Sequence, residues 1–201
     1  MDLDRLNKQM QFIIEIDKVK SVLRQNFISD GSRRENDSEH SWHLAMMVVI
    51  LSEYFKGADI LKTVKMVLIH DLVEIYAGDT FAYDEKGYLD KDEREQAAAD
   101  RLFALLPQDQ ASEYRDLWDE FERMDTGEAI FAAAVDRIQP LLMNSESGGK
   151  MWKQHKVTRE MVLKRNKLVL EEAPGVIAEF VRKRIEDSAV KHCFYEDGQG
   201  E

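Results

Sequence analysis

The chain has 201 residues, of which 44% are hydrophobic and 33% are charged, a composition typical of a globular protein with one substantial core. Its 39 acidic residues outnumber its 28 basic ones, and the formal net charge of −11 excludes polynucleotides and anionic membrane surfaces as partners. A small anionic substrate stays compatible, because local cations or one metal ion can reverse the potential inside a pocket. We therefore expect one domain over residues 1–201.

The chain carries one cysteine, Cys193, which cannot form an internal disulfide, and its first residues do not resemble a signal peptide. The longest stretch without Asp, Glu, Lys or Arg, Ser41 to Ser52, is much shorter than the ~18 residues that a membrane-spanning helix requires. These features predict a soluble protein of the reducing cytoplasm.

Apolar residues recur with helical spacing along most of the chain, and no segment alternates with a period of two for long enough to predict a strand. We expect Asp37 or Ser38 to cap the second helix, Asp59 to cap the third and Gly78 to end it. The expected helices, in chain order, run from about Leu6 to Arg24, from the cap at Asp37 or Ser38 to Phe55, from Asp59 to Gly78, from Lys91 to Leu106, and over about 110–124, 127–143, 158–172 and 174–190.

The predicted fold class is therefore all-α, a compact bundle of many helices. We expect its core to span about 12–145, with the C-terminal helices of about 158–190 packed on that core or placed at a dimer interface. The polar residues of the fourth predicted helix, among them Glu93, Glu95 and Asp100, are interpreted as a solvated face.

Ionisable residues interrupt apolar helices at three places. His70, Asp71 and Glu74 lie in the third helix, which is apolar on almost every face from Met66 onward. Burying such groups is costly unless they are paired or bind a metal. His70 and Glu74 are four residues apart and share a face, while His70 and Asp71 are about 100° apart and can converge on one ion.

The other interruptions are Asp136, after an alanine-rich apolar run, and His40, at the start of the second helix. Each has an ordinary alternative, because a single buried histidine is more often hydrogen-bonded in the core and Asp136 has Arg137 beside it. Together the four candidates come from three buried helices, and helical bundles build metal sites from imidazoles and carboxylates on facing helices.

These residues and their surroundings resemble the HD-domain metal-dependent phosphohydrolase superfamily, in particular the small proteins related to bacterial 5′-deoxynucleotidases. The matching stretches are Glu35-Asn36-Asp37-Ser38-Glu39-His40-Ser41, His70-Asp71-Leu72-Val73-Glu74-Ile75-Tyr76-Ala77-Gly78-Asp79 and Ala133-Ala134-Val135-Asp136-Arg137. The resemblance implies an HD-domain fold with the metal site between its central helices.

The resemblance further implies that His40, His70, Asp71 and Asp136 bind one divalent cation. Two nitrogen and two carboxylate donors suit Mn²⁺, Co²⁺, Fe²⁺ or Zn²⁺ better than Ca²⁺. Family members with two metals carry additional histidines after the doublet, and this chain has none between His70 and His155. We therefore expect a single ion.

The resemblance implies a catalytic acid or base at Glu74, whose alternative role is to orient His70. It implies at Asp79 a residue that contacts the substrate or protonates the leaving oxygen, the alternative being a loop residue at the helix end. Arg24 matches a basic residue that contacts the 5′-phosphate. The chain departs from the family pattern at Gln25 and Asn26, where an aromatic residue and a proline are usual.

The loop after Asp79 also departs from the pattern, because Thr80-Phe81-Ala82-Tyr83 stands where the nucleotidases have a proline-bearing loop. These departures concern contacts with the base and the sugar. The glycine-hinged segment 148–155, which holds Trp152 and His155, is a candidate cover for the pocket or a subunit contact.

The leading hypothesis is a metal-dependent enzyme that hydrolyses nucleoside 5′-monophosphates, a 5′-deoxynucleotidase that acts as a homodimer. One alternative keeps the chemistry but changes the substrate to a cyclic nucleotide or a nucleoside polyphosphate. Another is a non-catalytic helical interaction protein in which the four candidate ligands form a buried polar network. The native metal and the preferred base and sugar are not determined by the sequence.

Overall fold

The computed structural model describes residues 3–196, and this part of the chain is mainly helical, as predicted. The helices are α1 (Leu3–Ile16), α2 (Asp37–Leu51), α3 (Ile60–Ile69), α4 (Glu74–Ala77), α5 (Lys91–Phe103), α6 (Gln108–Arg123), α7 (Gly127–Glu146), α8 (Lys150–Gln154), α9 (Arg159–Arg165), α10 (Lys167–Glu172) and α11 (Gly175–Val190), with 3₁₀ helices at Asp17–Ser21 and His70–Val73. None of the described helices is both long and apolar enough to cross a bilayer.

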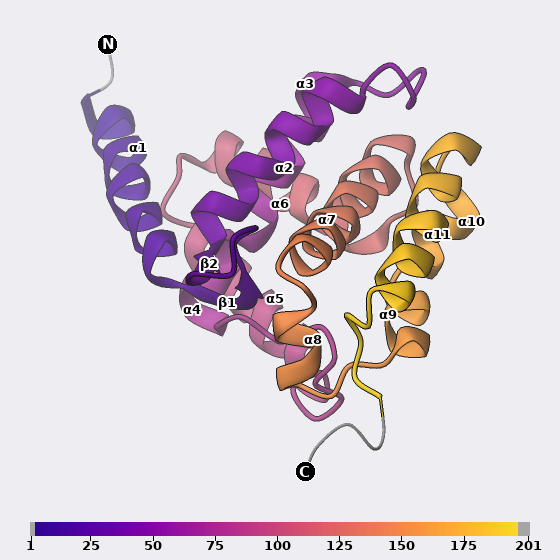
Figure 1. The fold of residues 1–201 in the computed structure, drawn as a ribbon. Helices are drawn as coiled ribbons and strands as arrows, with labels where there is room; N and C mark the ends of the chain where they lie inside the picture. Colours follow the sequence, from indigo (N-terminus) through magenta and orange to yellow (C-terminus); the bar gives the residue numbers. More distant parts are fainter. Residues whose placement is uncertain (1–2, 197–201) are drawn as a thin grey trace.

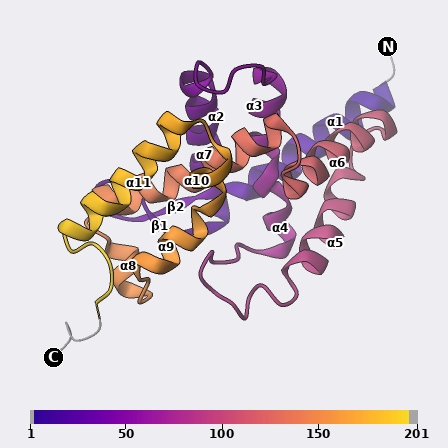
Figure 2. The ribbon, with the colours of Figure 1, turned by 90° about the vertical axis from the view of Figure 1, so that its right-hand side faces the viewer.

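Helix α7 passes through the middle of the molecule (Figure 1) and contacts α2, α3 and α6 as well as α10 and α11. Its run Ala132-Ala133-Ala134 is completely buried. Alanine side chains let neighbouring helices approach closely, so the backbone of α7 can lie at the centre of a dense core. In the view of Figure 2, the long segment between α4 and α5 loops out below the bundle. The predicted all-α class is therefore confirmed.

The N-terminal region departs from the predicted helix to Arg24. Helix α1 ends at Ile16, and a 3₁₀ turn leads into strand β1 (Leu23–Phe27), which pairs antiparallel with β2 (Arg34–Asn36). The prediction that no strand is present was wrong here, because these short strands carry charged and amide side chains instead of an alternating apolar face. The hairpin places Arg24 on a strand whose side chains reach the central helices.

The start of α2 also differs from the prediction by one residue. Asn36, not Asp37 or Ser38, is the N-cap, and it forms a capping box in which its side chain accepts from the Glu39 backbone amide. Asp37 is thereby left inside the first turn, where its side chain is completely buried. The cap predicted at Asp59 is present, and Thr158 caps α9 in the same way.

The third predicted helix is not continuous from Asp59 to Gly78. It ends at Ile69, tightens into the 3₁₀ turn His70–Val73 and resumes as α4, which stops at Gly78 with a positive φ of 79°. The indole Nε1 of Trp118 donates to the carbonyl of His70 at 3.1 Å. A side chain of α6 therefore satisfies a backbone group at the place where the helix changes its pitch.

The C-terminal helices pack against α7, and the predicted helix over 158–172 is divided in two at Asn166. Segment 148–155 contains the short helix α8, which the sequence did not predict. Met151 and Trp152 of α8 are each only 1% exposed, so both side chains pack within this chain and neither is available to a second copy.

Candidate active site

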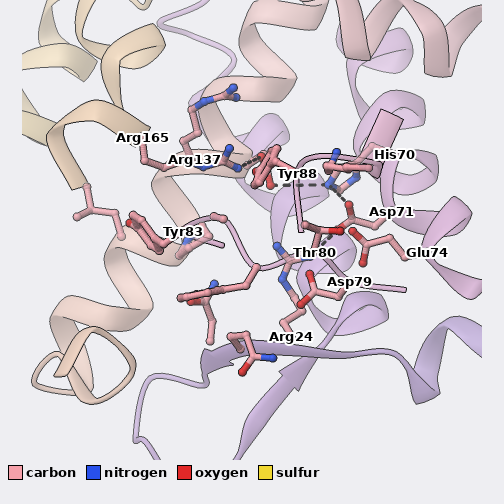
Figure 3. A pocket seen from close by; sticks show the side chains of 18 of the residues that line it. Arg24, His70, Asp71, Glu74, Asp79, Thr80, Tyr83, Tyr88, Arg137 and Arg165 are labelled. Carbon is pink, nitrogen blue, oxygen red and sulfur yellow. Dashed lines mark hydrogen bonds and ion pairs between the residues drawn. The ribbon is translucent and has the colours of Figure 1, made fainter. Parts of the chain in front are cut away.

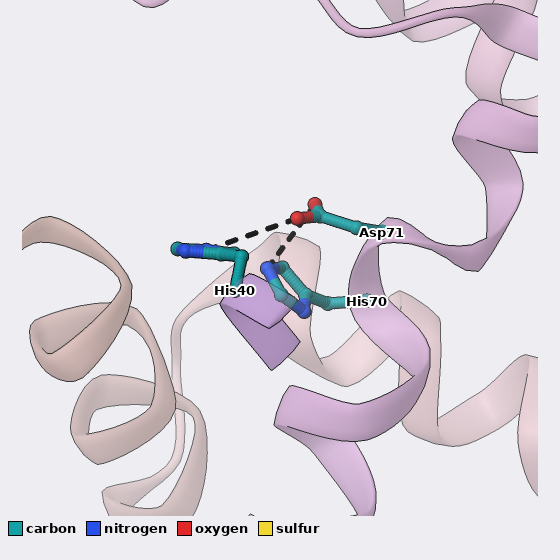
Figure 4. Close-up of side chains that lie close together, drawn as sticks. All are labelled: His40, His70 and Asp71. Carbon is teal, nitrogen blue, oxygen red and sulfur yellow. Dashed lines mark ion pairs between the residues drawn. The ribbon is translucent and has the colours of Figure 1, made fainter. Parts of the chain in front are cut away.

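The four predicted metal ligands converge between α2, the 3₁₀ turn and α7. His40 Nε2 lies 3.2 Å from Asp136 Oδ1 and 3.8 Å from Asp71 Oδ2. His70 Nε2 lies 3.1 Å from Asp71 Oδ1 and 3.8 Å from Asp136 Oδ1. All four side chains are buried. Figure 4 shows the two imidazoles and the Asp71 carboxylate pointing toward one another.

The other nitrogen of each imidazole is occupied by a carbonyl oxygen. His70 Nδ1 lies 2.9 Å from the backbone oxygen of Val67, and His40 Nδ1 lies 3.1 Å from Oε1 of Gln139. A carbonyl oxygen can only accept, so each Nδ1 carries the proton. In the neutral ring, Nε2 then has a lone pair aimed at the carboxylates. His70 Nε2 is buried without a hydrogen-bond partner.

The lone pair on each imidazole Nε2 and the carboxylate oxygens that it faces repel each other unless a cation lies between them. Burial lowers the pKa of His70, but the charges of Asp71 and Asp136 outweigh it and raise that pKa to about 10. The same competition leaves the pKa of His40 raised and the pKa of Asp136 well below its usual range. The donor set therefore demands positive charge, and a divalent metal ion fits it.

A second group of carboxylates adjoins the first. Oxygen atoms of Asp37, Asp71 and Glu74 lie within 4.8 Å of one another. Burial, together with the charge of Asp71, raises the pKa of Asp37 to about 7 and raises the pKa of Glu74 well above its usual range. The oxygen Oε2 of Glu74 is buried and has no partner. Glu74 is thus a carboxylate with a strong affinity for a proton beside the candidate ligands.

Arg24 lies between these carboxylates. Its Nη1 donates to Asp71 Oδ2 at 2.6 Å and to Asp37 Oδ1 at 3.1 Å. The buried Nε of the same guanidinium has no partner. Burial opposes the charge of Arg24, but Asp71, Glu74 and Asp37 outweigh it and raise the pKa of Arg24 well above its ordinary value. Arg24 therefore fixes the position of the Asp71 carboxylate through its oxygen Oδ2.

The cluster opens into a cleft of about 1040 Å³, counted to its open mouth. Figure 3 shows Arg24 and Asp79 on one side, with Arg137 and Arg165 across from them. Burial raises the pKa of Asp79, so a proton is held more tightly there than on an ordinary aspartate. Both residues at which the chain departs from the family pattern, Gln25 and Asn26, line this cleft, as do Thr80 and Tyr83.

Sequence reasoning missed several residues of the site. Gln139, three residues after Asp136, orients His40 and donates to Glu35 Oε1 at 2.7 Å. The available signal in the sequence was an amide side chain one turn after a candidate ligand, and the structure shows that it is fully buried. Asp37 was considered only as a cap, although it lies one turn before His40 and so faces the same way.

The prediction of a solvated face on α5 was wrong for Glu95. This side chain is buried, accepts from Lys91 Nζ at 2.6 Å, and lines the cleft. The partner suggested for Asp136 was also incorrect, since the cation that pairs with Asp136 is Arg165 at 3.3 Å and not Arg137. The second error concerns a contact between residues 29 positions apart, whereas Lys91 and Glu95 are one helical turn apart.

The HD-domain family model matches residues 16–177, and the chain belongs to this family. The membership and the His/Asp cluster confirm the predicted superfamily and the prediction that the protein is a hydrolase enzyme.

Individual relatives agree with this assignment. The crystal structure of a predicted metal-dependent phosphohydrolase from Magnetospirillum magnetotacticum MS-1 is 47% identical, covers 96% of both chains and has a TM-score of 0.89. The 5′-deoxynucleotidase HDDC2 of Homo sapiens is 29% identical over 138 residues, which are 68% of this chain and 67% of that protein. A conserved hypothetical protein from Pyrococcus furiosus, 22% identical with a TM-score of 0.60 over 90% of this chain and 99% of that one, shares the fold.

Proposed function

We propose that this HD-domain protein is a metal-dependent phosphomonoesterase that releases orthophosphate from nucleoside 5′-monophosphates, with 5′-deoxynucleotides as its preferred substrates. The observation that carries the proposal is the convergence of two imidazoles, each with its Nδ1 proton held by a carbonyl, on two buried carboxylates. The activity named for the human relative supports the choice of substrate.

His40, His70, Asp71 and Asp136 would hold one divalent ion, and we propose Mn²⁺, Co²⁺, Fe²⁺ or Zn²⁺ because of the mixed nitrogen and oxygen donors. Such an ion, when bound, polarises a phosphoryl oxygen and lowers the pKa of water. The residues around the ligands fix their orientation. Gln139 holds the ring of His40, and the backbone at Val67 holds that of His70.

Glu74 is the proposed general base. Its unpartnered Oε2 is buried beside Asp71, and its raised pKa favours uptake of a proton from the attacking water. Asp79 is the proposed general acid and substrate contact. It lines the cleft beyond Glu74, and its raised pKa favours the protonated form that can donate to the leaving 5′-oxygen. The two roles balance, because one proton leaves the water and one reaches the alcohol.

Arg24 is the proposed substrate-binding cation on this side of the cleft. Its Nη1 is engaged by Asp71 and Asp37, so its remaining N–H groups are those available to the phosphate. The same ion pairs hold Asp71 in place. Arg24 therefore has a positioning role in addition to any contact with the substrate.

Metal-free protein reconstituted with Mn²⁺ or Co²⁺ tests the proposal on a panel of deoxyribonucleoside and ribonucleoside monophosphates. We expect release of orthophosphate with a preference for the deoxy series. An Asp136→Asn variant serves as the control for contaminating phosphatases and should be inactive. Absence of activity over the whole panel contradicts the proposal. Release of pyrophosphate from a polyphosphate, or of a linear product from a cyclic nucleotide, shows that the same chemistry acts on another phosphoester.

We further propose that residues 1–201 form a single HD domain that functions as a homodimer in the cytoplasm. The cytoplasmic location is supported by the free thiol of Cys193, the chain's one cysteine. The dimer is supported by exposed apolar side chains on α2, including Trp42, Val49 and Ile50. Light scattering coupled to size-exclusion chromatography measures the oligomeric state.

A further inference from the structure

Two arginines on the wall of the cleft facing Arg24 have no role in the scheme above. Arg137 follows Asp136 on α7, and Arg165 is the last residue of α9. Both line the same cleft as the candidate metal ligands. Figure 3 shows them close together, across from Arg24 and Asp79. Their like charges are near enough that Arg165 contributes to lowering the pKa of Arg137, after the larger effect of burial.

Arg137 forms no ion pair with any residue that the structure describes. Its Nη1 donates to the backbone oxygen of Ala133 at 2.8 Å, and its Nη2 lies 3.3 Å from the sulfur of Met124. These are weak partners for a partly buried cation, and withdrawing a charge from water without a direct counter-charge is costly. Arg24, by contrast, is already paired with two carboxylates. Arg137 is therefore a partly buried cation that has no ion-pair partner of its own among the described residues.

Arg165 lies beside Arg137 and also contacts the cluster of candidate metal ligands. Its Nη2 donates to Asp136 Oδ2 at 3.3 Å, while Oδ1 of the same carboxylate faces His40 Nε2. The Arg165 side chain is 31% exposed, so part of its guanidinium remains accessible from the cleft. An anion that reached the cluster from the open side would pass both guanidinium groups.

The charges around the cluster favour such an anion site. Carboxylates dominate the deep side, which holds Asp37, Asp71, Glu74, Asp79 and Asp136. A phosphate dianion would be repelled there without cations on the side from which it approaches. Arginine suits this role, because its planar fork donates two parallel hydrogen bonds to phosphate oxygens.

We propose that Arg137 and Arg165 form the second half of the phosphate site, binding the non-bridging oxygens of the substrate's phosphoryl group from the wall opposite Arg24. The inference rests on the proposed phosphomonoesterase activity and deepens it. It leaves Arg24 as the cation on its own wall, where it also positions Asp71, and adds Arg137 and Arg165 as cations on the opposite wall.

Titration calorimetry of inorganic phosphate into Mn²⁺-loaded protein tests this assignment without turnover. We expect Arg137→Gln and Arg165→Gln each to weaken phosphate binding by about tenfold or more, since each removes charge-assisted hydrogen bonds. The Mn²⁺ content and the binding of uncharged deoxyadenosine should not change. Arg184→Gln is the matched control, because Arg184 pairs with Glu146 and is not part of the cleft lining.

Phosphate affinity within about twofold of the wild type in both variants overturns the proposal. A loss seen with pyrophosphate but not with phosphate also overturns it, since the arginines would then bind a second anionic group. If Arg137→Gln does not fold, Arg137→Lys is the substitute variant. Lysine keeps the charge but lacks the paired N–H donors of the guanidinium, so the affinity for phosphate should be intermediate. Phosphate binding that depends on these arginines in a protein without monophosphatase activity contradicts the proposed function alone.

Discussion

The two walls of the cleft are built differently. The ligand wall, which carries His40, His70, Asp71 and Asp136, consists of side chains that are buried and held by hydrogen bonds to neighbouring helices. The loop wall, formed by residues 79–90 together with α8 and α9, includes Tyr88, which is 40% exposed. The ligand wall lies in the core, whereas the loop wall combines exposed loop residues with buried side chains such as Trp152 of α8.

Under the proposed function, the difference places the chemistry on one wall and much of the substrate recognition on the other. Groups that must hold a metal need fixed geometry, which close packing and hydrogen bonds provide. Groups that select a substrate are on segments with fewer buried contacts, where sequence changes cost less stability. Substitutions in the ligand wall should therefore impair the reaction itself, and substitutions in the loop wall should alter substrate affinity.

The largest expected effect follows from removing a ligand. His70→Ala should abolish stoichiometric metal binding and lower the rate of phosphate release by more than about 10³-fold. Elemental analysis and a phosphate assay measure the two effects. His192→Ala is the control, because His192 is an exposed histidine distant from the cleft. Full activity in His70→Ala would show that the reaction does not need His70 as a metal ligand.

Glu74→Gln should separate catalysis from metal binding. The amide keeps the shape of the side chain but cannot take a proton from water, so kcat should fall by about 10² to 10⁴-fold. Metal content and KM should change little, because Glu74 is not one of the four candidate ligands. If metal content falls as far as activity does, Glu74 instead orients His70.

Gln139→Leu should weaken the metal site without touching a ligand. Leucine cannot accept the hydrogen bond from His40 Nδ1–H, and it cannot donate to Glu35 as the Gln139 amide does. Metal affinity should therefore fall by about 10- to 100-fold. Competition with a chelator measures the affinity. Activity at saturating metal should recover to near the wild-type value, which distinguishes this variant from His70→Ala.

The metal-free protein should lose stability as the pH rises. The folded-state pKa of His70 is raised from 6.5 to about 10, so its bound proton stabilises the fold below pH 6.5 and this contribution is lost as the pH approaches 10. The pKa of Asp37, raised from 3.8 to about 7, acts in the same direction between those values. Thermal unfolding of metal-free protein from pH 5 to 10 should show a falling Tm. Saturating metal should flatten this dependence, and a rising Tm in the metal-free protein would contradict it.

The smallest effect is expected in the loop wall. Arg94 donates to the carbonyls of Ala77 and Gly87 and to the hydroxyl of Thr80, and so holds residues 78–90 against α5. Arg94→Ala should raise KM about fivefold with little change in metal content. Parallel kinetics and metal analysis test this. A loss of metal would show that the two walls are not independent.

The ligand wall was predictable because the groups that form it break an apolar pattern. His40, His70, Asp71 and Asp136 are ionisable residues in otherwise buried helices, and their local sequence places each on the inner face. The ends of those helices were predicted less well. Asn36 and Asp37 are both good caps, and the sequence does not decide which of them the chain uses.

The rest of the cleft lining was harder to predict, because the sequence does not show which residues outside the ligand wall face the cleft. Glu95 lies on a helix that is polar on several faces, and its burial depends on how α5 packs beside the cleft. Arg24 stands on a strand too short and too polar to give an alternating pattern. The pairing of Arg165 with Asp136 spans 29 residues and depends on how α9 docks against α7.

The hydrogen bond from His70 to Val67 differs in kind from the one that His40 makes with Gln139. A main-chain acceptor is present whatever residue is encoded at position 67. A substitution there therefore leaves the Nδ1-protonated tautomer of His70 in place. The acceptor for His40 is a side chain that one codon change replaces. Libraries aimed at changing the metal preference of this enzyme should therefore randomise position 139 and leave position 67 unchanged. His70 and its main-chain acceptor would then stay the same in every variant. Differences in metal preference could be assigned to the His40 side of the site.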